Sequence, residues 1–106
     1  LTPLEAQRPA VRRVIGFAAC LSARLRGLDE AAAAAPWLDA DAAAKIVAAN
    51  NRPQAILRLL TEELVAAHRA GIYGEVTLRL LEDRVEELNA VQAACERIRN
   101  TPTPFA

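Results

Sequence analysis

One stretch decides the fold, residues 74–106, which reads GEVTLRLLEDRVEELNAVQAACERIRNTPTPFA. No Gly or Pro interrupts residues 75–99, and residues suited to a buried face recur there at spacings of three and four. This stripe consists of Leu78, Leu81, Val85, Leu88, Gln92 and Cys95, widened by Val91 and Ile98. The pattern predicts one long amphipathic helix with a single buried face. The Thr-Pro-Thr-Pro sequence that starts at Thr101 then ends the helix, because Pro lacks the amide donor and disfavours helical backbone in the residue before it.

The first quarter of the chain is also patterned as a helix. Thr2, Pro3 and the acid Glu5 predict a helix start. Pro9 interrupts these first turns, so we expect the regular helix over residues 10–26, ended by a glycine. Its buried face is expected to comprise Val11, Val14, Ile15, Ala18, Leu21 and Leu25. A solvated face is expected to carry Arg8, Arg12, Arg13, Arg24 and Arg26.

The middle of the chain begins with its least regular region. Five alanines after Asp29 and Glu30 can form a short helix that Pro36 ends. Trp37 and Leu38 are then expected to pack into the core, as a lone Trp usually does.

Capping residues mark two further helix starts. A short helix over residues 42–49 follows Asp39 or Asp41, and a longer helix to about residue 70 follows Asn51 or Arg52, with Pro53 in its first turn. The inward residues of the longer helix are expected to be Ile56, Leu57, Leu60, Leu64 and Ala67. Residues 71–74 form a connection of the length that joins antiparallel helices.

These elements predict an all-α fold, an antiparallel helical bundle of about three long helices plus one or two short ones. The chain has 106 residues, which corresponds to a single domain, residues 1–106. Its composition is 53% hydrophobic but only 4% aromatic, and an Ala-rich chain of this kind favours closely packed helices.

Charge and hydropathy exclude several function classes. Thirteen basic and thirteen acidic residues cancel, which argues against electrostatic binding of nucleic acid. No apolar run approaches the roughly 20 residues that span a bilayer. The chain begins with Leu1 and contains no Met, so we expect a soluble piece of a longer protein, with any membrane parts outside this piece.

No catalytic, cofactor or metal site is indicated by the residues. His68 is the only histidine, whereas a di-iron bundle needs two Glu-x-x-His motifs, so we expect His68 to be structural. Cys20 and Cys95 belong to no metal-binding or redox motif and are expected to be reduced, buried thiols. We therefore expect no cofactor and no enzymatic activity.

The motif at the end of the chain resembles the bestrophin family of membrane channels, in particular its bacterial members. The similarity rests on Cys95-Glu96-Arg97-Ile98, then Asn100-Thr101-Pro102 and Pro104-Phe105-Ala106. A second match is Asn51-Arg52-Pro53 followed by Ile56-Leu57, and a weaker one is Leu25-Arg26-Gly27. The resemblance covers nearly the whole chain in the same order.

The resemblance implies a pentamer around a central ion pathway, with inorganic ions and other copies of the chain as partners. The chain would be the cytosolic portion between two membrane segments, on the cytoplasmic side of the inner membrane, and the arginines of residues 8–26 would form a basic collar beneath the membrane. A lower constriction of the pathway would lie near Leu78, Arg79 or Leu80. A ring of Arg79 would favour anions and a ring of Leu would form a dewetting constriction, so the permeant ion stays open.

The remaining motif residues would serve assembly. They are Asn51, Pro53, Cys95, Glu96, Arg97, Ile98, Asn100, Pro102 and Pro104. Glu96 and Arg97 are expected to form ion pairs within or between subunits, so that replacing Glu96 by Ala weakens assembly. Pro102 and Pro104 are expected to redirect the chain into the membrane.

Two other function classes compete with the channel. One is a free-standing soluble interaction module that binds a partner helix through an exposed apolar stripe. The other is a small helical enzyme, which the missing site disfavours. Membrane-spanning sequence on both flanks would favour the channel over the module, and a bound metal would favour the enzyme.

Overall fold

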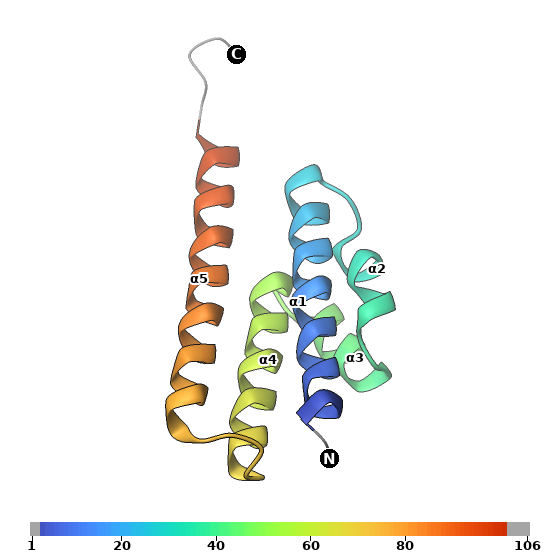
Figure 1. Ribbon diagram of the computed structural model, residues 1–106. Coiled ribbons are helices and arrows are strands. Elements are labelled where there is room, and N and C mark those ends of the chain that lie inside the picture. The colour runs from blue at the N-terminus through green and yellow to red at the C-terminus, as the bar shows by residue number, and fades with distance from the viewer. Residues whose placement is uncertain (1–2, 102–106) are drawn as a thin grey trace.

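The structure is a computed structural model that describes the backbone of residues 3–101 and the side chains of residues 7–101 (Figure 1). Every regular element in this range is helical, which confirms the predicted all-α class. The long helices are α1 (Pro3–Arg26), α4 (Arg52–Arg69) and α5 (Glu75–Asn100), and the short ones are α2 (Glu30–Ala34), the 3₁₀ turn η1 (Ala35–Trp37) and α3 (Ala40–Ala48).

The helices form a flat slab. In Figure 1, α5 lies along one edge, α2 and α3 lie along the opposite edge, and α1 and α4 lie between them. The described chain measures 53 × 29 × 20 Å, so its thinnest dimension is about two helix diameters. Helix α4 runs antiparallel to both α1 and α5, which therefore run parallel to each other (Figure 1). The most extensive packing joins α1 to α4, whereas α5 packs mainly on α4 and contacts α1 much less.

Capping side chains fix where the middle helices start. The carboxylates of Asp29 and Asp39 accept hydrogen bonds from the amides of Ala32 (3.1 Å) and Ala42 (2.8 Å), which place the N-termini of α2 and α3. Helices α1 and α4 are followed by glycines with positive φ, Gly27 at 70° and Gly71 at 80°, a backbone conformation that strongly favours Gly.

The core is centred between α1 and α4, and α2, α3 and α5 each contribute to it. Its buried members are Phe17, Cys20, Leu21, Ala34, Ile46, Ile56, Leu57, Leu60, Leu64 and Val85. The predicted inward residues of α4 are therefore correct, with Ala67 half-buried. The stripe of α5 also faces the core as predicted, from Leu78 to Cys95.

The prediction that Val91 and Ile98 belong to the buried stripe of α5 is wrong. Val91 and Ile98 are exposed, because α1 contacts α5 too little to cover that flank of the helix. Trp37 and Leu38 are only half-buried, since they lie over α1 near the edge of the slab. Helix α3 begins at Ala40, two residues before the prediction, because Asp39 rather than Asp41 is its cap.

Helix α1 does not break at Pro9, contrary to the prediction. It begins at Pro3 and continues through Pro9 to Arg26. A proline inside a helix removes one backbone hydrogen bond, here to the carbonyl of Glu5, and the turns on either side remain helical. Thr2, the predicted cap of this helix, lies outside the described residues.

The buried face of α1 is also rotated from the predicted one. Four residues expected to face inward are exposed, namely Val11, Val14, Ile15 and Ala18, whereas Arg13 is buried at 7% exposure. The cause is that α1 is packed on two sides, by α4 and by the α2–η1 segment. Gly16 allows the second contact, because a Cβ at this position would lie 3.3 Å from the Cβ of Trp37.

Candidate functional site

The start of α5 carries the three residues predicted to form a constriction, and the structure places them in different surroundings. Leu78 is half-buried and packs against the core, whereas Arg79 and Leu80 are exposed. Val76, which the sequence analysis did not select, is 76% exposed. Val76, Arg79 and Asp83 follow i, i+3, i+7 spacing and share the edge of α5 directly opposite Val85.

Leu80 lies to one side of this edge. Its helical position is close to that of Val91 and Ile98, on the flank of α5 that faces α1. The outermost edge of α5 therefore consists of one apolar side chain followed by charged ones. Such an edge offers both features of an ion pathway, an apolar contact and fixed charge.

The Asn51 motif joins α4 to α5. The side-chain oxygen of Asn51 accepts a hydrogen bond from the amide of Gln54 (3.1 Å) and another from Nε2 of Gln92 (2.9 Å). One atom thus caps α4 and holds the middle of α5. Pro53 is buried in the first turn of α4, and Gln92 is 2% exposed, with its own oxygen buried and unpartnered among the described groups.

Glu96 holds the far end of α5 against α1. Arg24 Nε donates to Glu96 Oε1, and Arg24 Nη1 donates to Glu30 Oε1 at 3.3 Å. Arg52 Nη1 lies 3.6 Å from Glu30 Oε2, so this cluster joins α1, α2, α4 and α5. Its hydrogen bond to Glu96 raises the pKa of Arg24. Glu96 therefore forms the ion pair that the motif predicts, and it does so within one chain.

The other motif residues at this end are less constrained. Arg97, Ile98 and Asn100 are exposed, and within residues 7–101 Arg97 forms no ion pair. Helix α5 ends at Asn100 as predicted, while Pro102 and Pro104 lie outside the described residues.

Two free thiols lie near this end of the molecule. Cys20 is fully buried, and desolvation, with a smaller effect of Glu30, raises its pKa to about 11 despite Arg52 and Arg24. Cys95 is half-buried. A thiol with such a raised pKa stays protonated and unreactive at neutral pH, so Cys20 serves as a core residue.

A second ion-pair cluster, around Arg13, was not predicted from the sequence. Arg13 Nε donates to Glu63 Oε1 at 2.8 Å, and Nη2 donates to Asp39 Oδ2 at 3.3 Å. The second oxygen of Glu63 is buried without a partner among the described groups. The amide of Ala42 and, to a lesser extent, Arg13 lower the pKa of Asp39. No local spacing signals this cluster, because its members are 26 and 50 residues apart.

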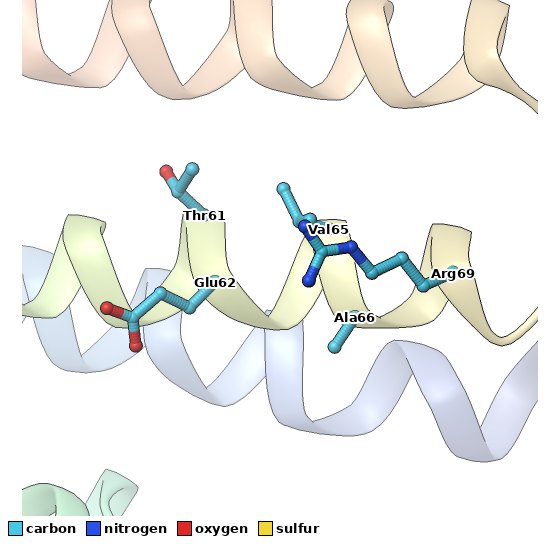
Figure 2. A pocket seen from close by; sticks show the side chains of 5 residues that line it. All are labelled: Thr61, Glu62, Val65, Ala66 and Arg69. Atoms are coloured by element: carbon cyan, nitrogen blue, oxygen red, sulfur yellow. The ribbon is translucent and has the colours of Figure 1, made fainter.

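Two hollows mark the broad faces of the slab. An apolar groove of about 430 Å³ runs between α1 and α5 and is lined mainly by Val14, Phe17, Ala18, Leu21, Leu88 and Val91. A second hollow, of about 500 Å³, lies on the outer face of α4 (Figure 2). It is lined by Thr61, Glu62, Val65, Ala66 and Arg69.

Within the described part of the chain, no three His, Cys, Asp or Glu side chains are grouped so that they could hold a metal ion. The ring of His68 stacks on the ring of Tyr73, and Nδ1 of His68 lies 3.1 Å from the backbone carbonyl oxygen of Tyr73. Burial raises the pKa of the Tyr73 hydroxyl, which donates to the carbonyl of Leu64. No helix among these residues is both long and apolar enough to cross a membrane.

Comparison with curated proteins finds relatives described as channels. The chain is 38% identical over 96 residues to the voltage-dependent anion channel-forming protein YneE of Salmonella typhi, covering 91% of this chain and 32% of that protein. It is 35% identical over 99 residues to the YneE protein of Escherichia coli K12, covering 93% and 33%. The chain thus spans about a third of the length of these relatives.

Solved structures agree with the sequence comparison. A bacterial bestrophin homolog from Klebsiella pneumoniae superposes with a TM-score of 0.88 at 30% identity, over 95% of this chain and 38% of that one. The same homolog carrying the mutation Y211A gives a TM-score of 0.89 over 96% of this chain. The model of the bacterial/fungal bestrophin family matches residues 2–106, and the chain belongs to that family.

Proposed function

We propose that this chain is the cytosolic portion of a bestrophin-like channel, that its copies line the lower part of the ion pathway, and that it supports subunit assembly. Family membership supports the channel class, and relatives are described as anion channel-forming. The proposal includes a homopentamer, inorganic ions as the permeating species, and a position on the cytoplasmic side of the inner membrane.

One observation carries the pathway assignment, the exposure of Val76 and Arg79 on the edge of α5. Val76 is a large apolar residue that is 76% exposed, at the start of a helix whose opposite face packs on the core. A ring of Val76 would give a narrow, poorly hydrated constriction, and a ring of Arg79 one turn later would attract anions. Leu80 would flank this edge, and Leu78 would support it from the core side.

The test uses cysteine substitutions in the full-length protein, in a Cys95→Ala background. We expect a negatively charged thiol reagent to reduce ion flux into liposomes for Val76→Cys and for Arg79→Cys. Leu78→Cys is the matched control from the same turn, and the reagent should leave its flux unchanged because this side chain faces the core. Flux that is insensitive in all three variants would contradict the assignment to the pathway.

The proposed role in assembly concerns the motif residues. The ion pair between Glu96 and Arg24 of the same chain changes what we expect of Glu96. Since Glu96 pairs with Arg24 of its own chain, Glu96→Ala is expected to loosen the end of α5 first and to weaken assembly as a consequence. Arg97, which is exposed, is the residue better placed to reach another subunit.

A further inference from the structure

Helices α1 and α5 end side by side, at the same end of the slab (Figure 1). Arg24 in the last turn of α1 pairs with Glu96 in the last turns of α5. Nη1 of Arg99 also donates a hydrogen bond to the backbone carbonyl oxygen of Arg24, at 2.7 Å. Residues 26–28 and 97–100 are thereby brought together on one surface, at the end of the slab.

Exposed positive charge is gathered on this surface. Arg26, Arg97 and Arg99 are exposed, and within residues 7–101 none of the three forms an ion pair. The hydrogen bond that Arg99 donates goes to a neutral carbonyl group, so it leaves the charge of this guanidinium uncompensated.

The acids near this surface are mostly engaged elsewhere. Glu30 and Glu96 both pair with Arg24, and both are largely covered. Asp29 is exposed, and its carboxylate caps α2 by accepting a hydrogen bond from the amide of Ala32. The exposed surface therefore presents three guanidinium groups against a single carboxylate.

Two large apolar side chains lie among these arginines. Ile98 is 76% exposed, and Leu28 is 55% exposed. The amide of Leu28 donates to the carbonyl oxygen of Ala23 at 2.8 Å, which folds the chain back over the last turn of α1. Arginines in a last helical turn also interact favourably with the helix dipole, but this effect does not account for exposed apolar side chains. Basic and apolar side chains exposed together are typical of surfaces that lie in the membrane interface.

We propose that this surface, the basic end, binds the anionic headgroups of membrane phospholipids. The basic end consists of Arg26, Leu28, Arg97, Ile98 and Arg99. Anionic headgroups attract arginines that lie near the membrane surface, and the two apolar side chains would enter the layer between headgroups and acyl chains. A nucleic acid would match the charge of the basic end but not its apolar side chains.

This inference rests on the proposed function, which puts the chain on the cytoplasmic side of a membrane. There, Pro102 and Pro104 are expected to lead the chain from the end of α5 into the bilayer. The basic end follows α5 directly, so it is the part of the slab that this arrangement brings nearest to the headgroups (Figure 1).

The basic end differs from the collar of arginines expected over residues 8–26. Of those arginines, only Arg26 belongs to it. Arg8 lies toward the other end of α1, Arg12 donates to a backbone carbonyl, and Arg13 is buried against carboxylates. The arginines of α5 take the place of these residues.

The experiment places a fluorescent probe on the basic end of the full-length protein in proteoliposomes. Ile98→Cys in a Cys95→Ala background carries the probe. The vesicles are mixtures of phosphatidylcholine and phosphatidylglycerol, with a nitroxide quencher near the headgroup of one lipid or the other. At low salt, we expect the quencher on phosphatidylglycerol to be at least about twofold more effective than the quencher on phosphatidylcholine. High salt should reduce this preference, because it screens the charges.

Substitutions of the arginines test the cause of the preference. The triple variant Arg26→Gln/Arg97→Gln/Arg99→Gln should lose it. The triple variant Arg26→Lys/Arg97→Lys/Arg99→Lys should keep it, because the positive charge remains. A probe at Ala44→Cys, which is exposed on α3 away from the basic end, should be quenched by neither lipid.

The matched control variant is Arg8→Gln/Arg58→Gln/Arg84→Gln, at three exposed positions outside the basic end. It changes the net charge equally and should keep the preference of the parent. A preference that this control also loses would indicate a general effect of net charge and overturn the proposal.

Three further results would overturn the proposal. Equal quenching by the two lipids in the parent would exclude selective binding of anionic headgroups. A preference that survives the substitution of all three arginines by Gln would place its source elsewhere in the protein. No quenching by either lipid would show that another segment of the protein or a soluble partner covers this end.

Ion flux into the same vesicles separates this inference from the proposed function. Flux without a lipid preference would retain the channel and reject the lipid contact. A lipid preference without flux would retain the contact and reject the channel.

Discussion

Arg13 is the residue whose environment departs most from its type. Its guanidinium is almost fully buried and pairs with Glu63, which is itself partly covered. Buried ion pairs contribute little net stability, but removing one partner leaves an uncompensated charge. Arg13 therefore adds little net stability itself, but its removal would leave the partly covered carboxylate of Glu63 without its partner.

We expect Arg13→Met to lower the free energy of unfolding by roughly 2–3 kcal/mol, because the carboxylate of Glu63 loses its donor. Urea unfolding of the 106-residue chain measures this change. The matched control is Arg8→Met, at an exposed position of the same helix, which should cost less than about 0.5 kcal/mol. The double variant Arg13→Met/Glu63→Leu should recover part of the loss, and a double variant as unstable as the sum of its singles would contradict this account.

Cys20 predicts a pH dependence of stability. Its pKa is about 11 in the folded chain against 9.0 for the free group, so the folded state holds the proton more tightly than the unfolded state. The contribution of Cys20 to the free energy of unfolding is complete below about pH 9 and is lost as the pH rises toward 11. The free energy of unfolding falls over this range by at most about 2–3 kcal/mol on account of this thiol.

Unfolding free energies across this alkaline range should fall more steeply for the parent chain than for Cys20→Ala. The control variant Cys95→Ala should keep the parent slope. Equal slopes in the parent and in Cys20→Ala would show that other groups cause the alkaline loss.

At the scale of elements, one atom, Oδ1 of Asn51, serves both α4 and α5, because it caps α4 and accepts a hydrogen bond from Gln92 of α5. We expect Asn51→Ala to destabilise the chain by roughly 2–3 kcal/mol, because α4 loses its cap and the buried amide of Gln92 loses its acceptor. Thermal unfolding would measure the loss. Asn51→Asp keeps an acceptor in both contacts and should recover most of the stability, while Asn50→Ala, one residue before the cap, should change it little.

The helices also show how far the sequence alone could predict the structure. Helix α5 packs on one side only, so its apolar period identified the core face from Leu78 to Cys95. Helix α1 packs on two sides, and there the apolar period predicted that Val11, Val14 and Ile15 would be buried, whereas all three are exposed. Gly16 and Arg13 lie on the faces of α1 that are actually buried, and hydropathy reveals neither residue. Gly16 is buried because its missing side chain leaves room for Trp37, and Arg13 is buried because Asp39 and Glu63, both distant in sequence, pair with its charge.

The sequence indicated which part of α5 belongs to the candidate site but not which of its side chains face outward. The resemblance singled out Asn51 and Glu96 for a role in assembly, which stays a prediction, whereas their contacts between helices of one chain came only from the structure. Which residues of α5 face outward could not be fixed by that resemblance to better than a turn. The three-dimensional packing of Leu78 against the core decides it, and it brings Val76 into the candidate edge.

At the scale of the whole molecule, charge on the α5 edge should act on ions only if that edge faces the pathway. We expect Arg79→Glu in the full-length protein to shift the reversal potential in a salt gradient toward cations, by roughly 1 kcal/mol or about a fivefold change in permeability ratio. The matched control is Lys45→Glu, which makes the same charge change on α3 at the opposite edge of the slab. That charge lies more than a Debye length of about 8 Å from an axis beside α5, so it should be screened. An equal shift in both variants would indicate a general effect of net charge, and no shift in either would contradict the proposed position of Arg79 beside the ion pathway.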